Sequence, residues 1–234
     1  ANNVPTQTIS QFEVSGNTNI SWVSSTGGVS TLSVNGPTLT DNIFIDNGST
    51  LQLNSGGTSA INLTMVTTAS QRANISGTFI TNTNSTNNNS LTTNGVASNL
   101  FTVYPTGVIQ NNGGTYTSTA TTLVFDNTSN YNHNMDGGTL PTALWYNAVG
   151  PVISNINVTG VVSNSPGNQN QIFGNYTWDG TVAQTGAANL AMTSPTIQGN
   201  FNIISTGTGS IIYANASSGT IIINGNYNLQ GGDV

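Results

Sequence analysis

The 234-residue chain has no cysteine and very little charge. Without cysteine, neither disulfides nor thiolate metal sites can brace the fold. Only 3% of the residues are charged, against roughly 25% in ordinary soluble domains. Arg72 is the single basic residue, and the formal net charge is −6. Nucleic acids and anionic membrane surfaces both require clustered Lys and Arg, so we expect no nucleic-acid partner.

The chain also lacks the hydrophobic patterns of helices and membrane spans. No apolar run approaches the roughly 18 to 20 residues that a membrane span requires. No segment repeats apolar residues at the i, i+3, i+4 and i+7 positions of an amphipathic helix. Short alternating runs of β-branched and aromatic residues recur instead, a pattern that disordered chains do not have. The sequence therefore predicts an all-β protein with essentially no helix and no membrane span.

One five-residue phrase recurs towards the C-terminal end. Gly-Asn-Tyr-Thr-Trp at 174–178 returns as Gly-Asn-Phe-Asn-Ile at 199–203 and as Gly-Asn-Tyr-Asn-Leu at 225–229. The first two copies begin 25 residues apart (174 to 199) and the last two begin 26 residues apart (199 to 225). Each copy alternates aromatic, polar and apolar residues, as a half-buried strand does. A strand-and-turn repeat of roughly 25 residues indicates a solenoid in which each unit stacks on its neighbour.

The solenoid also explains the composition. Equivalent residues of successive parallel rungs lie about 4.8 Å apart, so a repeated charge would place like charges in contact. Asn, Thr and Ser stack without that cost, and Asn side chains can hydrogen-bond along the column. We predict one elongated parallel β-solenoid over residues 1–234, with rungs of about 25 residues and right-handed winding, the default for parallel crossovers. A β-sandwich is the alternative all-β fold, but it does not need sequence repeats.

The repeat also predicts which side chains stack. Tyr176, Phe201 and Tyr227 should form one column inside the solenoid, and the apolar residues two places on should form the next. Further strands are expected at 8–14, 19–23, 29–34, 42–45, 50–53, 60–66, 74–80, 99–103, 108–110, 115–117 and 121–125. Residues 81–94 are almost wholly polar, which favours an exposed loop over an Asn or Thr ladder inside the solenoid. The last residues read as a turn before another strand, so we expect a segment of a longer protein.

The second half of the chain resembles a known family. It contains, in order, Tyr-x-His at 131–133, Gly-Gly-Thr-Leu-Pro-x-Ala-x-Trp at 137–145, a Pro-Gly-Asn-Gln turn at 166–169 and the three Gly-Asn-aromatic phrases. This order resembles large repetitive cell-surface proteins of Bacteroidota over about 123–234. The resemblance implies an exported parallel β-solenoid, displayed through the type IX secretion route, that serves as an adhesin or surface fibre. The sorting domain of that family is not visible, and the chain lacks the Cys that its members commonly carry after the Gly-Gly-Thr motif.

The sequence offers little catalytic chemistry. Asp126, His133 and Asp136 form the only set that joins a base to two nearby carboxylates, and no Lys or Arg stands near to stabilise an anion. We expect His133 and Asp136 to fix a loop by hydrogen bonds. Asp41 and Asp46 do not match the spacing of a calcium loop, and one His without Cys does not make a zinc site. We therefore predict no catalytic residues, no metal and no cofactor.

These observations together predict a non-enzymatic, extracellular structural or adhesive protein of the bacterial cell surface, assembled end to end into a fibre. The alternative is a carbohydrate-binding adhesin in which Trp22, Trp145 and Tyr146 stack on surface glycans. A glycan-active enzyme is a weaker reading. An ice-binding protein is another, because alternate Thr residues over 115–121 would lie on one strand face.

Overall fold

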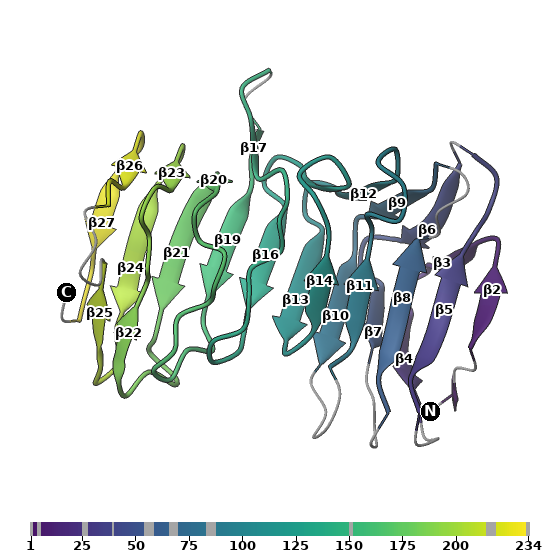
Figure 1. Ribbon diagram of the computed structural model, residues 1–234, viewed down its shortest axis with the longest axis horizontal. Coiled ribbons are helices and arrows are strands. Elements are labelled where there is room, and N and C mark those ends of the chain that lie inside the picture. Colours follow the sequence, from purple (N-terminus) through teal and green to yellow (C-terminus); the bar gives the residue numbers. More distant parts are fainter. Residues whose placement is uncertain are drawn as a thin grey trace.

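The computed structural model describes residues 2–3, 6–24, 28–38, 40–53, 59–65, 70–82, 88–149, 152–213 and 219–232. Over these residues the protein is a parallel β-solenoid without helix (Figure 1). The strands lie side by side along the long axis, and the colour passes steadily from one end to the other, so each rung stacks on the one before it. The predicted fold class is confirmed. The described residues contain no helix long and apolar enough to cross a membrane.

One ten-stranded parallel sheet, the long sheet, runs the length of the solenoid. In pairing order its strands are β1 (Asn2–Asn3), β4 (Asn19–Val23), β7 (Thr50–Leu53), β10 (Thr78–Asn82), β13 (Val108–Asn112), β16 (Asn130–His133), β19 (Asn155–Val158), β21 (Asn175–Asp179), β24 (Phe201–Ser205) and β27 (Tyr227–Leu229). Side chains alternate between the two faces of a strand. One face of the long sheet is therefore core and the other is solvent.

Two five-stranded parallel sheets complete the first half of the solenoid. The second sheet contains β2 (Gln7–Ile9), β5 (Ser30–Val34), β8 (Ile61–Met65), β11 (Ser90–Thr92) and β14 (Thr115–Thr117). The third sheet contains β3 (Phe12–Val14), β6 (Asp41–Ile45), β9 (Arg72–Ile75), β12 (Leu100–Val103) and β15 (Leu123–Phe125). Each rung visits the long, second and third sheets in that order, which encloses one apolar core.

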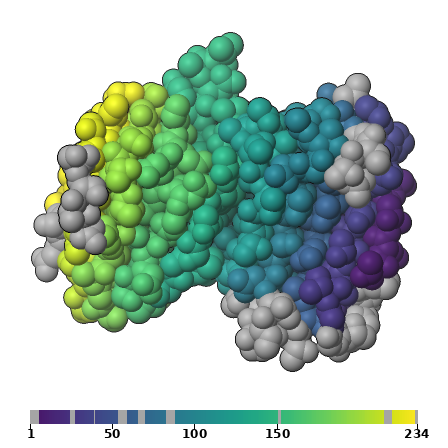
Figure 2. Space-filling model, in the orientation of Figure 1, coloured from purple at the N-terminus to yellow at the C-terminus, as the bar shows by residue number. Residues whose placement is uncertain are grey.

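The second half keeps the long sheet and reduces the other two faces to short pieces. These are a three-stranded sheet of β20 (Ile172–Phe173), β23 (Thr196–Ile197) and β26 (Ile222–Ile223), and a pair of β22 (Ala187–Asn189) with β25 (Ser210–Ile212). An antiparallel hairpin of β17 (Tyr146–Asn147) and β18 (Val152–Ile153) stands out from the rod (Figure 2).

The predicted stacking of the repeated phrase is confirmed. Tyr176 pairs with Phe201, which pairs with Tyr227. The next inward column holds the predicted apolar residues Trp178, Ile203 and Leu229 in register. The column that contains Tyr176 runs from β4 to β27 as Ile20, Leu51, Phe79, Ile109, Tyr131, Ile156, Tyr176, Phe201 and Tyr227.

The rung length is less uniform than predicted. Equivalent positions of the long sheet are 31 residues apart at Thr18 and Ser49. They are only 20 residues apart at Asn155 and Asn175. A solenoid needs only the strand registers to match, so connecting segments vary freely.

Three element predictions need correction. The strands expected at 8–14 and 74–80 are each two strands, because the chain turns from one sheet to another within them. The loop expected at 81–94 is largely solenoid: Thr81 and Asn82 end β10, Ser90–Thr92 form β11, and Asn89 is buried. Residues 83–87 lie outside the described residues. The Asn and Thr ladder inside the solenoid, weighed as the alternative there, is what the described part contains.

The glycines of the repeated phrase are required by space. None of Gly174, Gly199 and Gly225 has a positive φ. A Cβ at Gly174 would lie 2.3 Å from the carbonyl oxygen of Ser154, and one at Gly225 would lie 2.2 Å from the carbonyl oxygen of Gly199. Backbones of successive rungs touch at this corner, so only glycine fits.

Candidate functional site

Trp145 is not a stacking platform. It is fully buried, and its ring lies on Phe125 with centroids 4.4 Å apart and planes 19° from parallel. Its indole Nε1 donates a hydrogen bond of 3.0 Å to Oε1 of Gln171, which satisfies the only polar group of the side chain. This residue belongs to the core, and the prediction that it meets a glycan is wrong.

The other two predicted stacking residues lie far from each other in the fold. Trp22 is half-buried in β4 near the N-terminal end, where its ring packs against Phe12 at 5.2 Å between centroids. Tyr146 is half-buried at the base of the hairpin, where it lines an apolar depression of about 470 Å³ with Leu144 and Ile172. Trp145 and Tyr146 border the same depression, but Trp22 lies on another strand far from it, so the structure does not bring the three residues into one site.

The histidine is part of a buried polar network. His133 Nε2 lies 2.7 Å from the carbonyl oxygen of Gly137, and Nδ1 lies 3.4 Å from the Tyr131 hydroxyl. Burial lowers the pKa of His133, and the hydrogen bond to Gly137 opposes that shift. The Tyr131 hydroxyl also accepts from Nδ2 of Asn111 at 3.0 Å. A neutral histidine with both nitrogens engaged is a structural group.

Asp136 fastens one rung to the next. Its carboxylate accepts hydrogen bonds from the backbone N–H groups of Val162, Ser163 and Asn164, at 2.8, 2.9 and 2.8 Å. Desolvation raises the pKa of this carboxyl, but the hydrogen bonds from Asn164, Ser163 and Val162 outweigh it and lower the pKa to about 2. As predicted, His133 and Asp136 fix a loop by hydrogen bonds, each with its own partners.

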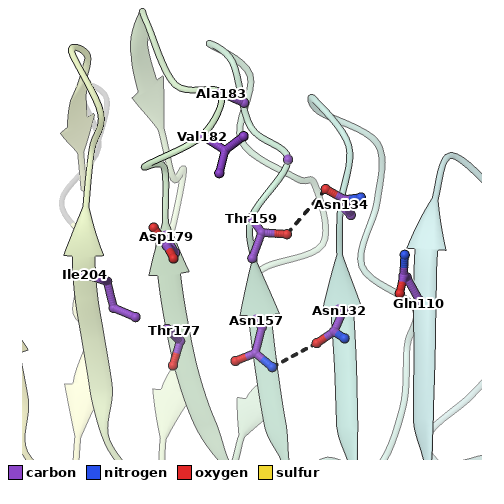
Figure 3. Close-up of a pocket in the computed structure, with 11 residues that line it drawn as sticks. Gln110, Asn132, Asn134, Asn157, Thr159, Thr177, Asp179, Val182, Ala183 and Ile204 are labelled. Atoms are coloured by element: carbon purple, nitrogen blue, oxygen red, sulfur yellow. Dashed lines mark hydrogen bonds between the residues drawn. The ribbon is translucent and has the colours of Figure 1, made fainter. Parts of the chain in front are cut away.

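A groove on the outer face of the long sheet is lined mainly by amide and hydroxyl side chains. It has a volume of about 540 Å³ and crosses five strands, from Gln110 on β13 to Ile204 on β24 (Figure 3). Its floor is made of amide and hydroxyl side chains on or beside β16, β19 and β21, namely Asn132, Asn134, Asn157, Thr159 and Thr177. We call it the amide groove. Its volume falls in the range of about 300–1,000 Å³ that small-molecule sites occupy.

Hydrogen bonds between rungs hold this floor flat. Asn157 Nδ2 donates to Asn132 Oδ1 at 2.9 Å, and Thr159 Oγ1 donates to Asn134 Oδ1 at 3.5 Å (Figure 3). The same ladder continues beyond the groove, where Asn228 Nδ2 donates to Asn202 Oδ1 at 2.7 Å. The predicted hydrogen bonding of Asn along the columns is confirmed.

The apolar wall of the groove comes from a loop and a β-bulge. Val182 and Ala183, in the turn after β21, overhang the end of β19 (Figure 3). The register between β21 and β24 shifts, so that Trp178 pairs with Ile203 but Asp179 pairs with Ser205. The extra residue, Ile204, is at an outward position of β24 and lines the groove.

The groove carries one charge and no metal cluster. Asp179 is the one ionisable residue that lines it, and its Oδ1 accepts hydrogen bonds from the backbone N–H and hydroxyl of Thr181, at 3.0 and 2.5 Å. Among the described residues, no group of three or more His, Cys, Asp or Glu side chains could hold a metal ion. The site therefore offers hydrogen bonds and apolar contact.

Sequence reasoning missed the groove residues, although their signal was present. Asn132, Asn157 and Thr177 are the outward, polar positions of the same strands whose inward positions carry the repeat. Amides in one column on successive rungs could have marked a continuous polar face. Comparison of the chain with protein-family models, curated proteins and solved structures gives no match.

Proposed function

We propose that this protein is a non-enzymatic, extracellular structural and adhesive protein, a β-solenoid segment of a bacterial surface fibre. The observation that carries the proposal is the unbroken ten-stranded parallel sheet, in which every rung is paired along the axis. Backbone hydrogen bonds along the axis make a stiff rod. The polar side chains of the solenoid also support the proposal, because the amide ladders and Asp136 connect rungs to one another.

The fibre would grow by adding strands at the rod's ends. Tyr227 and Leu229 on the edge strand β27 are each 46% exposed, although their column is buried in the rungs before it. A terminal strand with apolar side chains favours pairing with a further strand. Head-to-tail stacking, in which the C-terminal end of one rod meets the N-terminal end of the next, gives an open polymer.

Electron microscopy and fibre diffraction of the purified chain test this proposal. We expect rods or filaments and a meridional repeat of about 4.8 Å, the spacing of successive rungs. Compact particles without that repeat would overturn it. Tyr227→Asp is the matched variant: a charge on the edge strand should shorten filaments while single rods persist.

A second candidate function, ice binding, is favoured by the outer face of the second sheet. Its outward positions form two columns of hydroxyl or amide side chains. One is Thr8, Ser33, Thr64, Thr92 and Thr117, and the other includes Thr31, Asn62, Ser90 and Thr115. The columns repeat at about 4.8 Å along the axis and lie about 6.6 Å apart across it. A regular, uncharged array of this kind can hold surface water in fixed positions.

The array differs from the one predicted from 115–121. Only Thr115 and Thr117 belong to strand β14, whereas Thr119 and Thr121 hydrogen-bond to each other at 2.9 Å in the turn that follows. The threonines that matter are spread over successive rungs. Thermal hysteresis of the chain tests ice binding: Thr64→Tyr, on the central strand β8 of the face, should abolish it, and a zero reading for the unaltered chain removes this candidate.

A further inference from the structure

We propose that the amide groove binds an extended, neutral glycan; this inference rests on the adhesive function proposed above and names its ligand. The groove combines a hydrogen-bonding floor, one carboxylate and an apolar wall on the outer face of the long sheet. A sugar ring presents the same combination, with hydroxyl groups at its rim and C–H groups on its faces. The two surfaces are therefore complementary in kind.

The floor retains hydrogen-bonding capacity after the ladder is formed. Asn157 uses Nδ2 to donate to Asn132 Oδ1. The Asn157 Oδ1 acceptor and the Asn132 Nδ2 donor then make no hydrogen bond with another described residue. An amide has two N–H donors and an oxygen with two lone pairs. Because the ladder fixes both planes, these groups meet a hydroxyl without further ordering, and pre-organisation of this kind favours affinity.

The carboxylate adds a strong acceptor at the end of the floor. Asp179 lines the groove (Figure 3) and binds Thr181 through Oδ1, and Oδ2 accepts no hydrogen bond from another described residue. Hydrogen bonds from a neutral hydroxyl to a carboxylate are stronger than those between neutral groups. Asp179 therefore suits a pair of neighbouring sugar hydroxyls.

The wall is exposed in a way that a structural role does not explain. Val182 is 93% exposed and Ile204 is 39% exposed, and both line the groove. Neither contributes to the core in these positions. Contact with the C–H face of a sugar would remove this apolar surface from water, which is favourable by roughly 25 cal/mol per Å².

Charge selects against acidic glycans. The groove holds Asp179 and no cation, and the single basic residue, Arg72, lies on β9 of the third sheet. The chain as a whole carries a formal net charge of −6. A uronate or sulfate group would meet repulsion without a compensating partner, so the ligand is uncharged.

The dimensions favour a chain over a single sugar. The groove crosses five strands, from β13 to β24, and four spacings of about 4.8 Å give a length of about 19 Å. That length accommodates several sugar rings end to end. The glycan would lie along the solenoid axis, with about one ring to each rung.

Two pairs of matched variants test the groove in the full chain. Val182→Asp places a carboxylate on the wall, and Val149→Asp places the same charge on another valine that is 86% exposed, in the hairpin loop. Asn132→Ala removes one ladder amide inside the groove, and Asn228→Ala removes one outside it. The probes are laminarin, mannan and cello-oligosaccharide as neutral glycans and polygalacturonate as the acidic comparator, each followed by calorimetry.

We expect at least one neutral probe to bind and polygalacturonate not to bind. Val182→Asp and Asn132→Ala should each weaken binding by roughly tenfold or more. The new carboxylate of Val182→Asp loses its hydration when the glycan binds, and the amide lost in Asn132→Ala leaves a sugar hydroxyl without a partner. The control variants, Val149→Asp and Asn228→Ala, should bind as the unaltered chain does. The inference is overturned if no neutral probe binds, if the acidic probe binds as well, or if controls and groove variants behave alike. Electron microscopy of Val182→Asp separates the two proposals. If this variant forms intact rods but binds no glycan, the fibre proposal is unaffected. If the chain binds glycan but forms no rods, the groove proposal is unaffected.

Discussion

The two halves of the solenoid enclose their core differently. Up to Phe125, three continuous sheets surround the core, and the rungs are long: Thr18 and Ser49 are 31 residues apart, and Thr81 and Asn111 are 30 residues apart. From Asn130 onward only the long sheet continues, and the rungs are shorter. Paired asparagines there, such as Asn155 with Asn175, are as little as 20 residues apart. A shorter rung leaves fewer residues for strands on the other two faces.

Glutamine side chains replace part of the missing ladder in the second half. Gln184 Nε2 donates to the carbonyl oxygen of Ser210 at 2.7 Å, and Gln171 Nε2 donates to that of Pro141 at 3.1 Å. Both bonds connect different rungs. Buried backbone groups must find partners, so a solenoid can lose strands where side-chain amides take over.

The cores differ as well. In the first half the buried residues are mostly aliphatic, such as Leu51, Leu63 and Ile75. In the second half aromatic rings contact one another in series, from Phe125 and Trp145 through Phe173 and Tyr176 to Phe201, Tyr213 and Tyr227. Large rings fill the space between irregular connections that short aliphatic side chains would leave open.

A charge in the column of Tyr176 should produce the largest effect. Tyr176 is fully buried, so Tyr176→Asp leaves an unpaired carboxylate in the core and should lower the free energy of unfolding by about 4 kcal/mol or more. Tyr227→Asp is the same change in the same column on the edge strand, where the side chain is 46% exposed. It should cost about 1 kcal/mol. Chemical denaturation of both variants measures the difference, and equal losses would mean that the column is not buried as described.

Two of the three tryptophans, Trp145 and Trp22, provide the next comparison. Trp145→Ala opens a cavity among the rings of Phe125, Tyr131 and Phe173, and should cost about 3–5 kcal/mol. Trp22→Ala, in the half-buried position of the first half, should cost about 1–2 kcal/mol. Thermal unfolding of the pair checks the order. A milder Trp145 variant would show that the aromatic half can collapse around the missing ring.

A smaller effect is expected at the corner of the rungs. Gly174→Ala places a methyl group against the backbone of Ser154 and should cost about 1–3 kcal/mol. Gly28→Ala is its control in the first half, since a Cβ there meets nothing within 4 Å, and it should change stability by less than about 0.5 kcal/mol. If Gly174→Ala is tolerated equally well, the rungs do not touch at that corner.

The smallest effect is the pH dependence at the junction of the halves. Burial lowers the pKa of His133, so between its ordinary value of 6.5 and its folded value the unfolded chain binds more protons. Stability should therefore fall as the pH drops below about 6.5. Asp136, with a pKa of about 2, loses its contribution only below its ordinary value of 3.8. The melting temperature of the unaltered chain should be lower at pH 5 than at pH 7, and the difference should be smaller for His133→Asn.

The last three rungs were predictable because they share one sequence phrase. Gly174, Gly199 and Gly225 occur at nearly constant spacing, and strand register follows directly from that spacing. The first half shares the architecture, but its long-sheet strands β4, β7, β10 and β13 do not carry the Gly-Asn-aromatic phrase. Strands that match in register but not in sequence leave no repeat to find.

Side-chain environments set by distant residues could not be predicted. Asn89 looked exposed within a polar run, yet it is buried, because its amide donates to the carbonyl oxygens of Leu53 and Asn82 and accepts from the N–H of Ile61. Trp145 looked like a platform, but Phe125 and Phe173, from the rungs on either side, pack against its ring. The amide groove depends on a bulge and an overhanging loop, neither of which has a sequence pattern of its own.

Paired cysteines test the stacking of the rungs most directly, since the chain has none of its own. Asn132 and Asn157 are directly opposed on β16 and β19, and the strand spacing of about 4.8 Å suits a disulfide. Gln110 and Asn157 occupy the same column two rungs apart, at about 9.6 Å, too far to bridge. Asn132→Cys with Asn157→Cys should oxidise to a disulfide in the folded chain, and Gln110→Cys with Asn157→Cys should keep free thiols. Free thiols in the first pair, or a disulfide in the second, would contradict the solenoid.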